Sequence, residues 1–179
     1  MLDENEKNQL EEWTNKKCSE VLFDSDKDNW SQHTSVFDSK VKGKSNLAFI
    51  IEDTNNNKFG AYTTSTINQT NSWTTDHNSF LFSLKSNGRV SGMHKFEIQS
   101  NYAQYACSLR SKSNYSLIAF GGSSYWNMWI RKENNKSDSG CGQYTSDYNY
   151  HGCENAFLPN CMNTQRTYTP KRFVVIQMK

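Results

Sequence analysis

Residues 47 to 64 read LAFIIEDTNNNKFGAYTT, two apolar runs on either side of an asparagine-rich segment. The runs LAFIIED and KFGAYTT are rich in β-branched and aromatic residues, which are typical of strands. TNNN between them is a polar segment of the kind that forms turns. The stretch therefore predicts an antiparallel β-hairpin, and we expect it to lie near the centre of the fold.

The sequence on both sides of this hairpin continues in short apolar runs. We predict further strands at residues 79–84, 93–99, 115–122, 125–132 and 171–179. Asn87-Gly88, after the first of these runs, is the dipeptide that most strongly favours a tight hairpin. In YWNMWIRK, we expect Trp126, Met128 and Ile130 on one face and Trp129 on the other. We interpret residues 132 to 171, which are polar and tyrosine-rich, as long loops over the sheets.

Two apolar strand faces predict two packed layers, because each face must be buried against another element. Aromatic residues make up 13% of the 179 residues, so the core must rely on large rings. We therefore predict a mainly β fold, a two-sheet antiparallel β-sandwich with an N-terminal helix and flanking short helices or loops. Residues 1–18 would hold the helix, packed on or preceding a single domain at 19–179.

The predicted N-terminal helix covers residues 3 to 17. Asp3 can cap its first turn and Glu6, three residues later, can reach back, which is the capping-box pattern. Leu10 and Trp13 form a narrow apolar stripe. A stripe this narrow indicates that the helix leans on a larger body.

The overall charge restricts the partners. The net charge is +2, which argues against an extended nucleic-acid contact. No leader-like segment and no run long enough to span a membrane is visible, so we expect an intracellular, cytoplasmic protein, monomeric by default.

The five cysteines are an odd number, which favours free thiols over a disulfide framework.

VLFDSDKDNWS, residues 21 to 31, places aspartates at alternate positions, as a calcium loop does. A standard loop starting at Asp24 needs Gly at its sixth position and Glu at its twelfth, where this chain has Asn29 and Ser35. We therefore interpret the stretch as a polar turn with a solvated acidic face. Its three anchors to the core would be Leu22, Phe23 and Trp30. A weak, nonstandard cation site is the alternative.

Three cysteines gather in the polar region after residue 132. Cys141, Cys153 and Cys161, with His151, could bind zinc, but only His151 and Cys153 have the close spacing such sites use. We predict no metal and no cofactor. The one-residue spacing in HGC rarely aligns a nucleophile with its base. The alternative hypothesis is a thiol-based redox enzyme or sensor that uses these three cysteines.

Two further motifs give weak signals. FGGSS, residues 120 to 124, lacks the lysine of a phosphate loop and indicates a tight turn. YTPKRF, near the C-terminus, carries Lys171 and Arg172 and leaves a DNA-binding regulatory domain as another alternative. No set of residues in the expected positions of a catalytic site stands out, so a non-catalytic protein is favoured.

Taken in order, five segments of the chain resemble the TLDc domain family. They are VLFDSDKDNWS with Trp30 and Ser31, the central hairpin with Asp53, Phe59, Gly60 and Ala61, then NSFLFSL, IAFGGSSYWNMWI and RFVVIQM. The resemblance runs from about residue 20 to the end. Family members usually carry Glu where this chain has Asn78, and their glycine run is longer than Gly121-Gly122.

The resemblance implies a β-sandwich with flanking helices and a role in resistance to oxidative stress. Some members bind the vacuolar proton pump, which makes its V1 part a candidate partner, and no cofactor or agreed catalytic mechanism comes with the family. We expect an interaction surface at one end of the sandwich. Its candidate residues are Asp53, Phe59, Gly60, Asn78, Ser79, Gly121 and Gly122.

Overall fold

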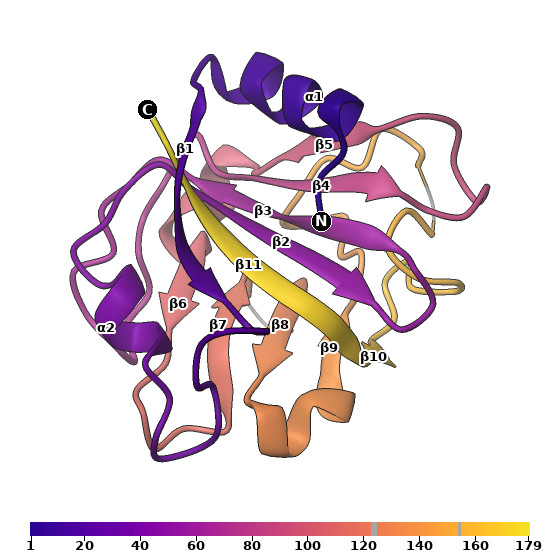
Figure 1. The fold of residues 1–179 in the computed structure, drawn as a ribbon. Helices are drawn as coiled ribbons and strands as arrows, with labels where there is room; N and C mark the ends of the chain where they lie inside the picture. The colour runs from indigo at the N-terminus through magenta and orange to yellow at the C-terminus, as the bar shows by residue number, and fades with distance from the viewer. Residues whose placement is uncertain (123–124, 154) are drawn as a thin grey trace.

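The computed structural model describes residues 1–122, 125–153 and 155–179, and it confirms the β-sandwich (Figure 1). In spatial order, the six-stranded sheet consists of β1 (Cys18–Asp24), β11 (Pro170–Met178), β2 (Leu47–Asp53), β3 (Lys58–Thr63), β4 (Phe80–Lys85) and β5 (His94–Glu97). The five-stranded sheet consists of β10 (Arg166–Tyr168), β9 (Ser139–Cys141), β8 (Met128–Arg131), β7 (Ser116–Phe120) and β6 (Cys107–Leu109). All pairings of neighbouring strands in the two sheets are antiparallel.

In the described part of the chain, four short helical segments flank the sheets. They are α1 (Glu4–Thr14), α2 (Phe37–Val41) and the 3₁₀ turns η1 (Ser100–Tyr105) and η2 (Glu133–Asp138). Figure 1 shows the C-terminal strand β11 in yellow, running between β1 and β2. The last strand of the chain therefore completes the sheet that the first strand begins.

The predicted central hairpin is formed by β2 and β3, which pair from Leu47 opposite Thr63 to Glu52 opposite Lys58. Both faces of β2 are buried, which explains its nearly continuous apolar sequence. Phe49 faces the other sheet and contacts Phe120 of β7, with ring centroids 5.1 Å apart. Aromatic rings thus fill much of the space between the sheets, as the composition predicts.

Helix α1 covers the outer face of the six-stranded sheet. The capping box is present, since the Asp3 carboxylate accepts from the Glu6 amide and the Glu6 side chain accepts from the Asp3 amide. Leu10 is fully buried in a second apolar cluster on this face, and the ring of Trp13 packs against Phe80 and Phe82 of β4. The helix ends at Thr14, three residues earlier than predicted, because Asn15 adopts a left-handed conformation with φ 51°.

Two predictions about the second half of the chain were wrong. The region 132–171 is not only loops, because it supplies β9 and β10 of the five-stranded sheet. Each is three residues long and lacks alternating apolar residues, so periodicity could not reveal it. The strand expected at 125–132 begins only at Met128, and the ring of Trp126 lies near Trp129 (6.1 Å) and not with Met128 and Ile130 in the core. Ser123 and Ser124 of the predicted FGGSS turn lie outside the described residues.

The acidic turn after β1 is held by cations of the protein itself. Leu22, Phe23 and Trp30 are buried, as expected of anchors, but the prediction of a solvated acidic face was wrong for two aspartates. Asp24 is 4% exposed, and its carboxylate pairs with the Arg172 guanidinium at 2.7 Å, which holds the pKa of Asp24 below its usual range. Asp28 accepts from the Lys40 ammonium at 2.7 Å. These contacts explain the alternate aspartates without a bound cation.

Candidate functional site: an arginine–tryptophan surface

The residues expected in the central hairpin turn out to be structural. Asp53 is fully buried, and its carboxylate closes the hairpin turn by accepting from the amides of Asn55 (2.9 Å) and Asn57 (2.8 Å). The ring of Phe59 lies in the core against Tyr168, with centroids 5.0 Å apart. Gly60 is also buried. A partner could not contact Asp53, Phe59 or Gly60 directly in the folded protein.

The turn before Ser79 lies at the opposite end of β3 from the hairpin turn. Lys58, where β3 begins, pairs with Lys85, whereas Tyr62, near its end, pairs with Phe80. Ser79 is 1% exposed and donates to the Tyr62 carbonyl at 3.0 Å. The strand therefore separates two groups of residues that we expected to form one surface, although Asn78 itself is exposed.

The two glycines at the end of β7 permit close packing, as expected. Gly121 has φ 58°, and a Cβ there would lie 2.6 Å from the Tyr148 ring. A Cβ on Gly122 would lie 2.8 Å from Trp126 and 2.9 Å from Trp73. The absence of a side chain at Gly122 therefore lets two indole rings approach the same point of the backbone.

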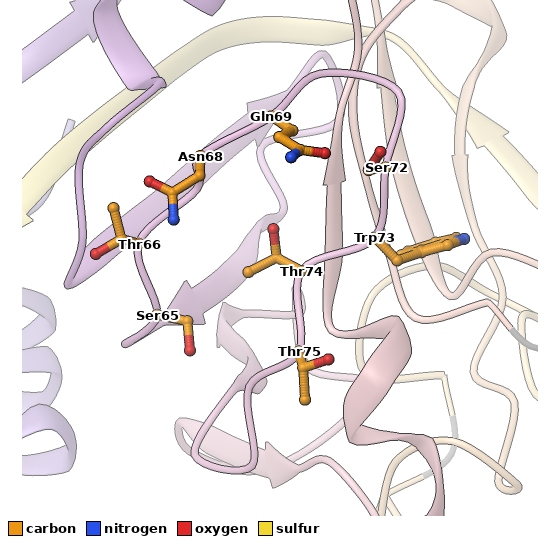
Figure 2. Close-up of a pocket in the computed structure, with 8 residues that line it drawn as sticks. All are labelled: Ser65, Thr66, Asn68, Gln69, Ser72, Trp73, Thr74 and Thr75. Carbon is orange, nitrogen blue, oxygen red and sulfur yellow. The ribbon is translucent and has the colours of Figure 1, made fainter.

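Trp73 also borders a pocket with a volume of about 490 Å³. The pocket is lined by hydroxyl and amide side chains of one segment: Ser65, Thr66, Asn68, Gln69, Ser72, Thr74 and Thr75. Figure 2 shows the Trp73 ring extending away from the side chains of Thr74 and Gln69. Trp73 thus belongs to the wall of this uncharged pocket and, through its ring, to the surface described below.

The buried carboxylate of Asp76 fixes the segment that forms this pocket. It accepts five hydrogen bonds, from the Thr63 and Thr64 hydroxyls and from the amides of Thr64, Ser65 and Asn78. Burial raises the pKa of Asp76, but the hydroxyl and amide donors outweigh it and hold this pKa below its ordinary value. Asp76 could not be identified from the sequence, because an isolated Asp in a polar stretch gives no signal of burial.

The outer face of the five-stranded sheet carries what we name the arginine–tryptophan surface, formed by Trp73, Arg110, Trp126, Trp129 and Arg131. The guanidinium of Arg110 lies 5.0 Å from the Trp126 ring centroid and 5.8 Å from that of Trp73. The guanidinium of Arg131 lies 5.8 Å from the Trp126 ring centroid. These distances are within the range of cation–π attraction, so the five side chains form one packed cluster.

The β-strands of this sheet fix the cluster from below. Trp129 of β8 faces away from the core and lies over Gly140 of β9, where a Cβ would be only 2.2 Å from the indole. Its indole Nε1 donates to the Asp138 carbonyl at 2.8 Å. Arg131 donates from Nη1 to the Ser116 hydroxyl at 2.7 Å. Four of the five side chains, those of Trp73, Arg110, Trp126 and Arg131, are partly exposed, whereas Trp129 is buried.

The two guanidinium groups have no acidic counter-charge within the described part of the chain, where no ion pair involves Arg110 or Arg131. The Nε of Arg110 is buried and has no hydrogen-bond partner among these residues. Burial, together with the like charge of Arg131, lowers the pKa of the Arg110 guanidinium below its ordinary value. Among the described residues, the positive charge that this surface presents beside its apolar rings is therefore uncompensated.

Of the three cysteines in the redox hypothesis, Cys141 and Cys161 are fully buried. Contact with Cys141 lowers the pKa of the Cys161 thiol to about 7, against the effect of burial, and its sulfur donates to the Gln143 Oε1 at 2.8 Å. Cys153 is partly exposed, and its neighbour is His94 of β5, not His151. The redox hypothesis therefore depends mainly on Cys153.

The contact between Cys153 and His94 is not that of an aligned nucleophile and base. The sulfur lies 3.3 Å from Nδ1 and 4.0 Å from Nε2, and these distances are too similar for the sulfur to lie in line with the Nδ1 lone pair. The sulfur therefore sits over the imidazole ring. Across the residues that the structure describes, no group of three or more His, Cys, Asp or Glu side chains is placed to hold a metal ion.

We predict that thiol reagents distinguish these cysteines in the native protein. Cys153 should label at least tenfold faster than Cys141 and Cys161, because only its sulfur is reachable without local unfolding. The measurement is native labelling with iodoacetamide across pH, read by mass spectrometry of the digested chain. Rates for Cys153 equal to those of a free cysteine at every pH would remove the redox hypothesis, and fast labelling of Cys161 would contradict the assignment.

The two cations of the basic C-terminal segment, Lys171 and Arg172, are already paired with carboxylates and so contribute little to DNA binding. The Lys171 ammonium pairs with the Glu52 carboxylate at 2.8 Å, and Arg172 pairs with Asp24. Cations already paired within the protein contribute less to a phosphate backbone contact. Among the helices of the described residues, none has both the length and the apolar composition needed to cross a membrane.

Comparison with known proteins agrees with the resemblance seen in the sequence. A search of curated proteins finds no match. The family model for the TLDc domain matches residues 1–171, so the match includes α1, the helix that covers the six-stranded sheet, as well as both sheets up to the start of β11. Since this match covers most of the 179 residues, the chain belongs to the TLDc domain family.

Proposed function

We propose that this TLDc chain is a non-catalytic protein-interaction module that acts in the oxidative-stress response, and that the arginine–tryptophan surface binds its partner. One observation carries the proposal: three tryptophans and two arginines gather on a single sheet face. Trp and Arg are among the side chains enriched at the energetic centre of protein interfaces, where they fill well-packed pockets from which water is excluded. The V1 part of the vacuolar proton pump is the partner we propose, because the family includes members that bind this pump.

This assignment revises the surface expected from the sequence. Gly122 remains part of it, because it seats the rings of Trp73 and Trp126. The buried residues Asp53, Phe59, Gly60 and Ser79 support the fold beneath or away from it. Substitution of these residues would change partner binding only by changing the stability of the domain.

We predict that Trp126→Ala weakens binding to the V1 part about tenfold or more, the loss typical of a central interface tryptophan. The measurement is equilibrium binding of the purified chain to purified V1, with the folded fraction of each variant determined by circular dichroism. Val21→Ala is the matched control, because Val21 is 55% exposed on β1 of the other sheet. Wild-type protein that does not bind V1 would remove this partner, and equal binding by the Trp126 variant would remove this surface.

The cellular role is tested separately. Cells that lack this protein should be more sensitive to hydrogen peroxide, and the wild-type chain should restore their resistance. The Trp126 variant should fail to restore it at an equal protein level. Full rescue by that variant would separate the stress role from the arginine–tryptophan surface.

A further inference from the structure

We propose that Arg110 and Arg131 bind the carboxylate side chains of an acidic segment on the partner protein. The inference takes from the proposed function the point that the partner is a protein. It adds the chemistry by which that partner is recognised. It concerns the two cations of the arginine–tryptophan surface, for which neither the family match nor the fold assigns a role.

The two arginines are brought together by the register of the five-stranded sheet. Arg110 follows β6 directly, and its amide donates to the Leu117 carbonyl of β7. Arg131 of β8 pairs with Ser116, the first residue of β7. The two residues therefore flank the same end of β7 from opposite sides, about 10 Å apart at the backbone, the width of two strand spacings. Both side chains then reach the ring of Trp126.

Two positive charges that share one tryptophan repel each other, and the repulsion is stronger where the groups are partly removed from water. An anion placed between them would relieve it. Arg110 also retains a buried Nε with no partner in the described residues, whereas Arg131 uses Nη1 for the Ser116 hydroxyl. Within the described residues, most N–H donors of the two guanidinium groups therefore have no hydrogen-bond partner and can donate to a ligand. Planar guanidinium groups bind carboxylates through paired hydrogen bonds.

A protein carboxylate suits this site better than a nucleic-acid backbone. Binding of a phosphate chain needs a track of cations, but the chain has a net charge of only +2, and the tail cations Lys171 and Arg172 are paired with carboxylates. The arginines are instead bordered by the rings of Trp73 and Trp126. Such rings can cover the apolar stems of Glu side chains or neighbouring apolar residues, which a peptide supplies.

The test measures binding of a fluorescent peptide with alternating Glu and Leu to the full chain by anisotropy. The control peptide has Gln in place of every Glu. We expect the Glu peptide to bind, the Gln peptide to bind at least tenfold more weakly, and the affinity to fall as salt is raised. Arg110→Gln and Arg131→Gln should each weaken the Glu peptide about tenfold, as expected for loss of a charge-assisted hydrogen bond.

Arg166→Gln is the matched control, because Arg166 is an exposed arginine of β10 in the same sheet. It should bind the peptide like the wild type. Arg110→Lys keeps the charge and should retain more affinity than Arg110→Gln. Thermal unfolding of each variant separates a loss of binding from a loss of folding.

Several outcomes would overturn the inference. These are equal binding of the Glu and Gln peptides, an equal loss in Arg166→Gln, or inorganic phosphate or a single-stranded oligonucleotide binding more tightly than the Glu peptide with the same arginine dependence. If the Glu peptide binds as expected but V1 does not, the site stands and the partner is wrong. If Trp126→Ala abolishes V1 binding while the arginine variants do not, the surface stands and its acidic ligand is wrong.

Discussion

Replacing Gly60 by alanine is expected to destabilise the protein by about 3 kcal/mol or more. A Cβ at this position would lie 1.9 Å from the Phe49 carbonyl oxygen and 2.6 Å from the Phe82 ring. The first of these atoms is backbone of the neighbouring strand, so relief requires β2 and β3 to move apart in the centre of the sheet. Added atoms in a closely packed core usually cost about 1 to 3 kcal/mol, and a clash with backbone lies at the upper end. Urea unfolding followed by tryptophan fluorescence measures the loss.

Gly92→Ala is the control for this prediction. Gly92 has φ 77°, but nothing lies within 4 Å of the position of its Cβ. Its replacement should therefore lose only about 1 to 2 kcal/mol, the strain of a left-handed backbone. A Gly60→Ala protein as stable as the wild type would contradict the clash. If that protein were fully folded but failed to bind its partner, Gly60 would belong to the interaction surface, as the sequence analysis first suggested.

Replacing Asp76 by asparagine is expected to destabilise the protein by about 2 to 4 kcal/mol. Both carboxylate oxygens accept hydrogen bonds, Oδ2 from Thr63, Thr64 and Ser65 and Oδ1 from Thr64 and Asn78. Either orientation of an asparagine amide would therefore point its NH₂ group at backbone or hydroxyl donors. Bonds to a charged acceptor contribute about 1.5 to 3 kcal/mol, and a buried donor without a partner adds to the loss. Chemical unfolding measures this loss. Asp3→Asn, at an exposed helix cap, should lose less stability.

The same carboxylate should give the protein an acid-sensitive component of stability. Its pKa is lower in the folded state than the value near 3.9 expected for an unfolded chain. The stabilisation is therefore fully present above about pH 4 and is lost as the pH falls through the lower, folded-state pKa. Unfolding measured from pH 6 to pH 2 should show this decline in the wild type and a smaller decline in Asp76→Asn. Parallel curves for the two proteins would contradict the assignment.

Local patterns predicted much of the fold. The capping box at Asp3 and Glu6 and the hairpin of residues 47 to 64 follow from interactions between near neighbours, so a few residues suffice to predict them. The helix end at Asn15 and the short strands β9 and β10 do not follow. Their conformations depend on packing against the rest of the domain. A polar stretch shows no periodic pattern of apolar residues from which this packing could be predicted.

The candidate site was predicted only in part. Gly122 was identified from its sequence context, and the structure places it under Trp73 and Trp126. Asp24 was predicted to be solvated, and Asp76 was not identified, although both are buried. The sequence does not show whether a carboxylate will lie next to hydrogen-bond donors in the fold. Arg172, which neutralises Asp24, lies 148 residues away in the chain.

The sequence by itself determined that this chain is a two-layer β protein with a capped N-terminal helix, because strand alternation, turn chemistry and capping depend on residues close together in the chain. Its membership of the TLDc family follows from the order of five resembling segments and from the family match. Only the tertiary structure decided that Trp73, Arg110, Trp126 and Arg131 share one surface. The order and register of β6, β7 and β8 bring these side chains together, and a glycine lets the rings close over the backbone. Neither strand order nor register follows from the pattern of any one segment, so the sequence did not predict that these four side chains lie together.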